Sequence, residues 1–125
     1  MMDVVVLLDA RVGRTADLLD MVTEAGVQVI ASCVFPRLGG RVAHIAVTDD
    51  DFEVVEDLLR DRLGGVADQR PCVVVPPGYP GGMPAVARKI ADAEVVISVA
   101  YHGEEGQMVL ATSDSARTRQ VLGLV

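Results

Sequence analysis

The sequence is poor in aromatic residues and in cysteine, and it has no long apolar run. Trp is absent and Tyr and Phe occur twice each, so the core must be built from Val, Leu, Ile and Ala. Two cysteines make neither a disulfide framework nor a metal motif. Cys33 and Cys72 lie in strand-like stretches, which favours small buried apolar side chains. No run approaches the length of a membrane span, and the N-terminus lacks a basic start followed by a long apolar stretch, so we expect a cytoplasmic protein.

Basic residues are also few. The chain has 11 Lys and Arg against 18 Asp and Glu, which gives a net charge of −7 and a pI near 4.6. A nucleic-acid partner would need a basic face that displaces counterions, and an anionic membrane would need one too. We therefore expect neither partner. At 125 residues, the chain is long enough to bury roughly two-thirds of its unfolded surface.

An internal repeat is the most informative feature that the sequence does contain. A strand-like segment, the glycine after it and a later segment recur at an offset of 68 (81 − 13 = 68). The aligned pairs are 3–7 with 71–75, Gly13 with Gly81, and 25–30 with 93–98. A shorter hairpin turn in the second copy lowers the offset to 64 at Asp50 and Asp114 (114 − 50 = 64). This period is too long for a solenoid unit, so we expect two repeats, residues 1–70 and 71–125, that share a core.

The first copy shows the order strand, helix, strand, strand, helix. Residues 3–8 are continuous and β-branched, which predicts a buried strand. Gly26 ends an amphipathic helix, and Asp50 with Glu53 forms a capping-box pair for the next one. The predicted elements are strands at 3–8, 27–35 and 41–48, and helices at 15–25 and from residue 50 to Gly64.

The second copy repeats this order and is shorter. Its predicted elements are strands at 72–75, 95–101 and 107–112, and helices at 83–93 and 114–122. Each copy is then βαββα, one strand short of a ferredoxin-like βαββαβ unit unless the copies lend strands to each other. The predicted fold class is α+β, ferredoxin-like, with two βαββα repeats whose antiparallel sheets carry helices on one face.

The first strand is apolar on both sides. Val4, Val6 and Leu8 point to one face of the sheet, and Val5 and Leu7 point to the other. Burial of such a side chain stabilises a fold by about 1.5–3 kcal/mol. We therefore expect the face without helices to be covered by the other repeat or by another subunit.

These elements resemble a pair of ACT domains. The family pattern is a strand, a Pro-Gly-x-Leu-type turn into a helix, Ala-Gly-x-Asn-Ile before the next strand, a hairpin and an Asp at the second helix. The second copy matches the turn as Pro80-Gly81-Gly82-Met83, and the first copy matches it loosely at 9–14. The first copy matches the later segment as Ala25-Gly26-Val27-Gln28-Val29. The resemblance covers nearly the whole chain.

The resemblance implies a small-molecule sensor, most often for an amino acid. Family members bind ligand at interfaces between paired units, near the first strand-to-helix turn and the strand after that helix. It implies ligand contacts from two sets of residues: Arg11, Val12, Gly13, Arg14 and Gln28 in the first copy, and Tyr79, Gly81, Gly82, Met83 and Val96 in the second. Gln28 and Val96 stand where many members carry an Asn, and only Gln28 can donate and accept hydrogen bonds.

Two turns permit alternative interpretations. Arg11 and Arg14 precede or open a helix, whose N-terminus favours an anion such as a carboxylate. They could equally be solvated arginines that balance Asp9 and Asp17. The glycines at 81 and 82 suit either a close ligand or a tight turn.

No catalytic residue, metal or cofactor is predicted. His44 has no nucleophile with supporting groups in its segment, which favours a hydrogen-bonded sheet histidine. His102, with Glu104 and Glu105, is interpreted as a wet hairpin tip. The leading hypothesis is a homodimeric regulatory protein that binds an amino acid and acts on itself or on a partner enzyme. The alternatives are an assembly module without a ligand and, weakest, a small ferredoxin-like enzyme.

Overall fold

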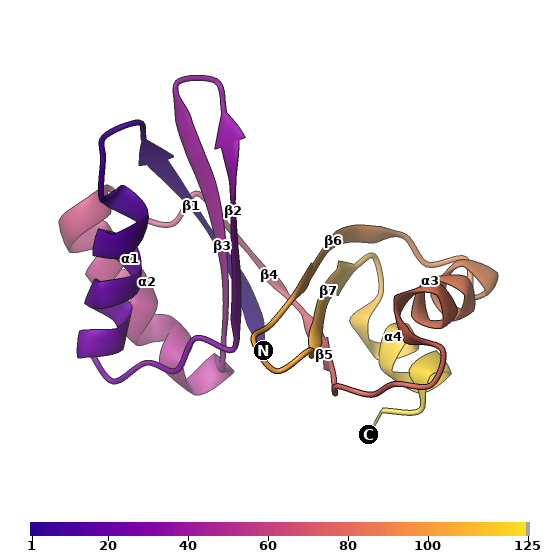
Figure 1. The fold of residues 1–125 in the computed structure, drawn as a ribbon. Helices are drawn as coiled ribbons and strands as arrows, with labels where there is room; N and C mark the ends of the chain where they lie inside the picture. Colours follow the sequence, from indigo (N-terminus) through magenta and orange to yellow (C-terminus); the bar gives the residue numbers. More distant parts are fainter. Residues whose placement is uncertain (125) are drawn as a thin grey trace. The chain divides into compact units, whose positions relative to one another are not determined.

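The computed structural model describes residues 1–124, and Val125, the last residue of the expected second repeat, lies outside them. The chain divides into two compact units, Met1–Arg70 and one that begins at Pro71 (Figure 1). Each unit has its own buried core.

The first unit has the order βαββαβ of a ferredoxin-like fold. Its elements are β1 (Met2–Asp9), α1 (Arg14–Glu24), β2 (Ala31–Arg37), β3 (Gly40–Val47), α2 (Asp49–Leu63) and β4 (Asp68–Pro71). The sheet order is β2-β3-β1-β4, and β3 pairs antiparallel with both β1 and β2. The prediction that this copy lacks a final strand was wrong. β4 is an edge strand of polar, largely exposed residues, so it lacks the apolar pattern from which a strand is predicted.

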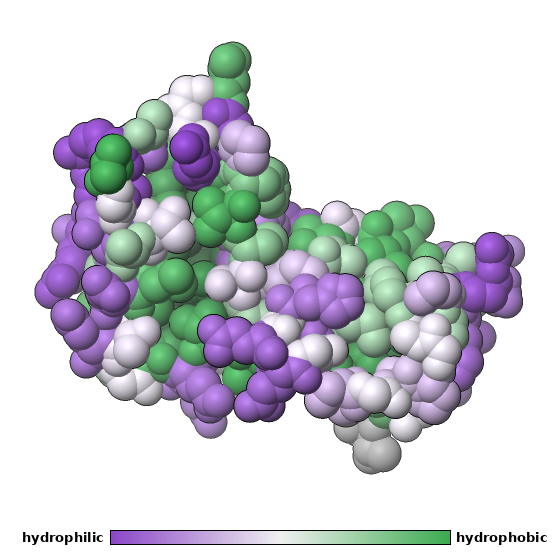
Figure 2. Space-filling view, viewed as in Figure 1, coloured by the Kyte–Doolittle hydropathy of each residue, from purple (hydrophilic) through white to green (hydrophobic). Residues whose placement is uncertain are grey.

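The core of this unit lies between one sheet face and the two helices. Val4 and Val6 of β1 and Ile45 of β3 pack with Leu18 of α1 and Leu59 of α2. Figure 1 shows both helices on the same side of the sheet. Hydrophilic residues cover the outer side of these helices in Figure 2. The helices therefore form one layer over the sheet, as the sequence predicted.

The burial of side chains on the other face of the first sheet changes along the length of the strands. Val5 is 7% exposed, whereas Leu7 is 45% exposed and Phe35 46% exposed. Leu7 and Phe35 share this face, because both pair with Val42 in the register. The apolar second face expected from β1 is thus buried along one part and open at the hairpin end.

The second unit is the βαββα unit that the sequence predicted. Its elements are β5 (Val73–Val75), α3 (Gly82–Asp92), β6 (Ile97–His102), β7 (Met108–Thr112) and α4 (Ser115–Leu122). The sheet is antiparallel with order β5-β7-β6. Its core contains Val75, Val86, Ile90, Leu110 and Leu122. No helix within residues 1–124 has the length and hydropathy that a membrane span requires.

The offset of 68 holds through the first helix of each unit. α1 and α3 have 11 residues each and begin 68 positions apart (82 − 14 = 68). Their N-cap residues, Gly13 and Gly81, have left-handed φ values of 86° and 81°. Both helices also end alike, since Val27 N–H donates to Val22 O and Val95 N–H donates to Ile90 O.

The later offset of 64 was wrong. Thr48 caps α2 by accepting from Asp51 N–H, and Asp114 caps α4 by accepting from Arg117 N–H, so the offset is 66 (114 − 48 = 66). The paired strands agree, because Val5 faces His44 whereas Val73 faces Leu110 (110 − 44 = 66). The run of three Asp residues after Thr48 left the helix start ambiguous, and Asp50 is therefore not the cap.

The strands after the first helices begin later than predicted. β2 starts at Ala31 rather than at residue 27, and β6 starts at Ile97 rather than at 95. Ala31 pairs with Ala46, one residue before β3 ends at Val47. Residues before Ile30 lie beyond the paired length of β3, and the Ile30 N–H itself donates to Ala46 O.

Candidate functional site

The turn from β1 to α1 brings the predicted residues 11–14 together. Gly13 is the N-cap of α1 and gives no side-chain cap. The carboxylate of Asp9 accepts from the Arg11 backbone N–H at 3.0 Å and from Arg11 Nη2 at 2.7 Å, and Arg14 Nε approaches it at 3.4 Å. The turn is thus closed by one carboxylate between two guanidinium groups.

Hydrogen bonding keeps Asp9 ionised. The Arg11 backbone N–H has the largest effect and lowers the pKa of Asp9; burial opposes it, and the Arg11 side chain lowers the pKa further. Arg14 also lies 3.6 Å from Asp17. These contacts support the interpretation that both arginines balance acids of the chain. A ligand carboxylate would have to share Arg11 and Arg14 with Asp9.

Two cavities lie against this turn. One has a volume of about 280 Å³ and is lined by Arg11, Arg14 and Arg62 together with Leu7, Leu8, Asp9, Leu63 and Gly64. The second, of about 210 Å³, is lined by residues 9–15 and Arg41. The structure therefore unites Arg11, Val12, Gly13 and Arg14, and it adds Arg41 and Arg62, which the sequence did not predict as site residues.

The close contact between β1 and β3 positions Arg41 beside the turn. Gly40 pairs with Asp9, and a Cβ atom on Gly40 would lie 2.1 Å from the backbone oxygen of Leu8. Only glycine permits this approach. Figure 1 shows the β1–α1 connection and the β2–β3 hairpin at the same end of the sheet.

Gln28 lies away from the arginine turn. Ala31 and Asp3 both pair with Ala46 of β3, so they lie at the same end of the sheet. The arginine turn follows Asp9, at the other end of β1. Six residues of strand span about 20 Å. Gln28 is exposed and precedes Ala31, so within the first unit it does not join Arg11–Arg14 in one cavity.

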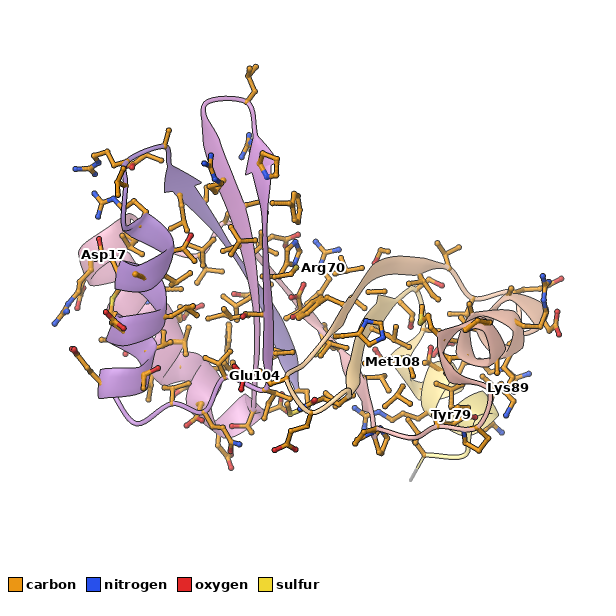
Figure 3. The ribbon with its side chains drawn as sticks, viewed as in Figure 1. Asp17, Arg70, Tyr79, Lys89, Glu104 and Met108 are labelled. Atoms are coloured by element: carbon orange, nitrogen blue, oxygen red, sulfur yellow. The ribbon has the colours of Figure 1, made fainter. Side chains whose placement is uncertain are left out.

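The equivalent turn in the second unit is held by its own contacts. The Tyr79 hydroxyl donates to Leu122 O at 3.0 Å and accepts from Lys89 Nζ at 2.9 Å (Figure 3). Lys89 Nζ lies 4.9 Å from the centre of the Tyr79 ring. Met83 packs against the core, and a Cβ on Gly81 would lie 2.6 Å from Ala85 Cβ. Packing accounts for these three residues.

The two remaining predicted site residues of the second unit, Gly82 and Val96, form hydrogen bonds through their backbone. Gly82 has a φ of 63° and donates its N–H to Tyr79 O. Val96 is 66% exposed, and its backbone N–H donates to Ser113 Oγ at 3.0 Å. Its side chain offers no polar group, and its backbone O accepts from Ser113 N–H, so both of its main-chain groups already have a partner.

His44 is a hydrogen-bonded sheet histidine, as predicted. Its Nδ1 lies 3.1 Å from both carboxylate oxygens of buried Asp3, and its ring stacks on Phe35 at 5.7 Å. Cys33 faces His44 in the register, but burial raises the pKa of its thiol. A raised pKa disfavours the reactive thiolate. Within residues 1–124, no cluster of three or more His, Cys, Asp or Glu is arranged to hold a metal ion.

Neither a family model nor a curated protein matches the sequence. Solved structures do match the fold. Protein BT0572 from Bacteroides thetaiotaomicron has a TM-score of 0.74 and 17% identity, over 98% of this chain and 85% of its own. The ligand-free regulatory subunit of aspartate kinase from Thermus thermophilus has a TM-score of 0.71 and 16% identity, over 98% and 87%. The same subunit from Thermus flavus gives 0.68 and 13%, over 98% and 89%.

The fold is the one seen in these regulatory subunits of aspartate kinase. At 13–17% identity the likeness establishes the fold. In this fold the first strand-to-helix turn carries cavities lined by arginines, which makes it the candidate site.

Proposed function

We propose that this chain is a non-catalytic regulatory protein that binds a small molecule, an amino acid or a related carboxylate, at the turn between β1 and α1. The observation that carries the proposal is the pair of cavities at this turn, where Arg11 and Arg14 meet the start of α1. The regulatory subunits of aspartate kinase that share the fold support a regulatory role.

The start of α1 has suitable groups for a carboxylate. The first N–H groups of a helix have no intrahelical acceptor and need one from outside. Thr48 and Asp114 supply it for α2 and α4, but Gly13 supplies no side-chain acceptor for α1. A ligand carboxylate would accept from these N–H groups and from Arg14, which is favoured by the helix dipole.

Binding would act by changing an equilibrium rather than by covalent chemistry. A ligand shifts a protein toward the arrangement that it binds better. We propose that this shift alters self-assembly, as a homodimer in the cytoplasm, or the activity of a partner enzyme. The exposed apolar end of the first sheet face, with Leu7 and Phe35, supports an assembling protein.

A thermal-shift screen against the twenty amino acids and common nucleotides, with light scattering on each hit, tests the proposal. A ligand that stabilises by about 2–3 kcal/mol raises the Tm by several degrees. Arg14→Gln should reduce that rise. The matched control is Arg88→Gln on α3, whose side chain is 77% exposed and pairs with Asp92 at 3.9 Å. A panel with no response would contradict ligand binding.

A module that assembles without a ligand is the second candidate. The apolar Val96 at the position where many ACT domains carry an Asn favours it. In that case no ligand would change the Tm of the Arg14→Gln or Gln28→Ala variant. A polar replacement of Phe35 would change the mass measured by light scattering.

A further inference from the structure

Five of the 11 basic residues gather at one end of the first unit. They line three cavities at the β1–α1 turn and the β2–β3 hairpin: Arg11, Arg14, Arg37, Arg41 and Arg62. Asp9 lines all three cavities, which have volumes of about 280, 210 and 190 Å³. They are therefore neighbouring parts of one surface, which we call the arginine end. This concentration is notable in a chain whose net charge is −7.

The fold, not the local sequence, produces this grouping. Gly40 pairs with Asp9 on one side and with Arg37 on the other, so the hairpin arginines flank the end of β1. Arg62 comes from the last turn of α2, just before Gly64. Three separate segments thus direct arginines to the same end of the sheet.

The charges that line these three cavities are poorly balanced, whereas Arg14 and Arg62 also line a fourth cavity, of about 330 Å³, with Asp17, Asp20 and Glu24. Asp9 is the one acid that lines these three cavities, and it contacts Arg11 and Arg14. Asp17 reaches Arg14 at 3.6 Å from outside. Arg37, Arg41 and Arg62 form no ion pair with any residue of the described range 1–124. Like charges at close range repel, so the arrangement favours a ligand that brings negative charge.

This imbalance restricts the ligand class. A zwitterionic amino acid in any of these cavities would place its ammonium group among two or three guanidinium groups, and the one lining acid, Asp9, is already hydrogen-bonded. A ligand with several anionic groups avoids this repulsion. Guanidinium groups bind phosphate and carboxylate through paired hydrogen bonds, so arginine suits either anion.

We propose that the arginine end binds a small ligand that carries at least two negative charges on phosphate or carboxylate groups. This inference rests on the proposed function and names the chemistry of its ligand. One anionic group would lie at the start of α1, near Arg11 and Arg14, and another toward Arg41 or Arg62. The ligand would then connect the turn to the hairpin or to the end of α2.

The test is a titration of the full chain with pyrophosphate, citrate, glycine and leucine, followed by calorimetry and by Tm. We expect pyrophosphate or citrate to bind at least tenfold more tightly than glycine or leucine. The ratio of the Kd values for pyrophosphate and citrate identifies phosphate or carboxylate as the preferred group. Raising NaCl from about 50 to 300 mM should weaken this binding, because salt screens exposed charges.

Two variants on one helix provide the matched comparison. Arg62→Gln removes a cavity arginine, whereas Arg60→Gln removes an arginine 61% exposed that pairs with Glu56 and Asp57 and lines none of the three cavities. Arg62→Gln and Arg41→Gln should each raise the Kd for the polyanion about tenfold, as expected for one charge-assisted contact. Arg60→Gln should leave it unchanged.

The outcomes separate this inference from the proposed function. If leucine or glycine binds as tightly as the polyanions, and Arg41→Gln and Arg62→Gln have no effect, the polyanion inference is wrong and the ligand-binding function stands. If Arg60→Gln weakens binding as much as Arg62→Gln, the attraction is a general charge effect and the site is wrong. If no compound in this titration or in the amino-acid and nucleotide screen changes the Tm, the proposed function itself fails.

Discussion

Replacement of Glu94 by glycine should stabilise the second unit. Glu94, with a φ of 61°, is the only non-glycine residue with a positive φ in the described part of the chain. Its counterpart at the offset of 68 is Gly26, with a φ of 81°. Both residues end a first helix in the same way, since Gly26 N–H donates to Thr23 O at 3.0 Å and Glu94 N–H donates to Ala91 O at 2.9 Å. The second unit therefore uses glutamate where the backbone favours glycine.

The magnitude follows from two opposing effects. A left-handed conformation costs a non-glycine residue about 1–2 kcal/mol, whereas the added freedom of glycine in the unfolded chain offsets about 0.4–1 kcal/mol. The Glu94 side chain is exposed and forms no ion pair with residues 1–124, so its removal should cost little. We expect a net stabilisation of about 0.5–1 kcal/mol, which corresponds to a rise in Tm of about 2–6 °C.

Tyrosine fluorescence during urea unfolding measures this change in the correct unit. The chain has no Trp, and both tyrosines, Tyr79 and Tyr101, belong to the second unit. Glu94→Gly should raise the urea midpoint without changing the m-value. Glu94→Ala removes the same side chain but keeps the strained backbone, so it should give a smaller rise. If the alanine variant is as stable as the glycine variant, or if glycine destabilises, the strain argument is refuted.

Three further predictions concern the first unit. Gly40→Ala adds no backbone strain but must move a strand by about 1.3 Å to bring a 2.1 Å contact to the 3.4 Å of ordinary packing, which should cost about 1–3 kcal/mol or more. Gly39→Ala meets nothing within 4 Å and should cost only about 1–2 kcal/mol, the strain of a left-handed residue at its φ of 81°; urea unfolding followed by circular dichroism, which also reports the first unit, measures both. Because its pKa is raised, the Cys33 thiol should react with iodoacetamide more slowly than free cysteine at pH 8. The pH at which its reaction rate increases should also be higher than for free cysteine. A rate equal to that of free cysteine would contradict the raised pKa. Asp3→Ala removes a buried carboxylate from His44 and should cost about 3 kcal/mol; a loss below about 1 kcal/mol would show that this contact contributes little.

The order of the elements could be predicted because its signals are local. Apolar periodicity predicted both first helices and the hairpin strands, and the recurrence of Gly13 at Gly81 predicted the repeat, in which both glycines are left-handed N-caps. Signals of this sort depend only on neighbouring residues. β4 was missed for the same reason, since its polar residues form a strand only through pairing with β1.

The candidate site could be predicted only in part. Arg11 and Arg14 lie at a helix start, and that placement is visible in the sequence. Arg37, Arg41 and Arg62 are distant from it along the chain, and only the pairing of β1 with β3 and the packing of α2 bring them there. The separation of Gln28 from the turn also follows from strand register, which the apolar pattern does not specify.

The two kinds of helix start set stability and binding against each other. A capping side chain typically stabilises a helix by about 1 kcal/mol, and α2 and α4 have one, whereas Gly13 and Gly81 give none to α1 and α3. A replacement that capped α1 would satisfy the N–H groups that an anion would otherwise use, but it would have to change the left-handed φ of 86° at Gly13 to the extended backbone of Thr48 and Asp114. Selection for a more stable protein and selection for ligand binding therefore favour different residues at the same turn.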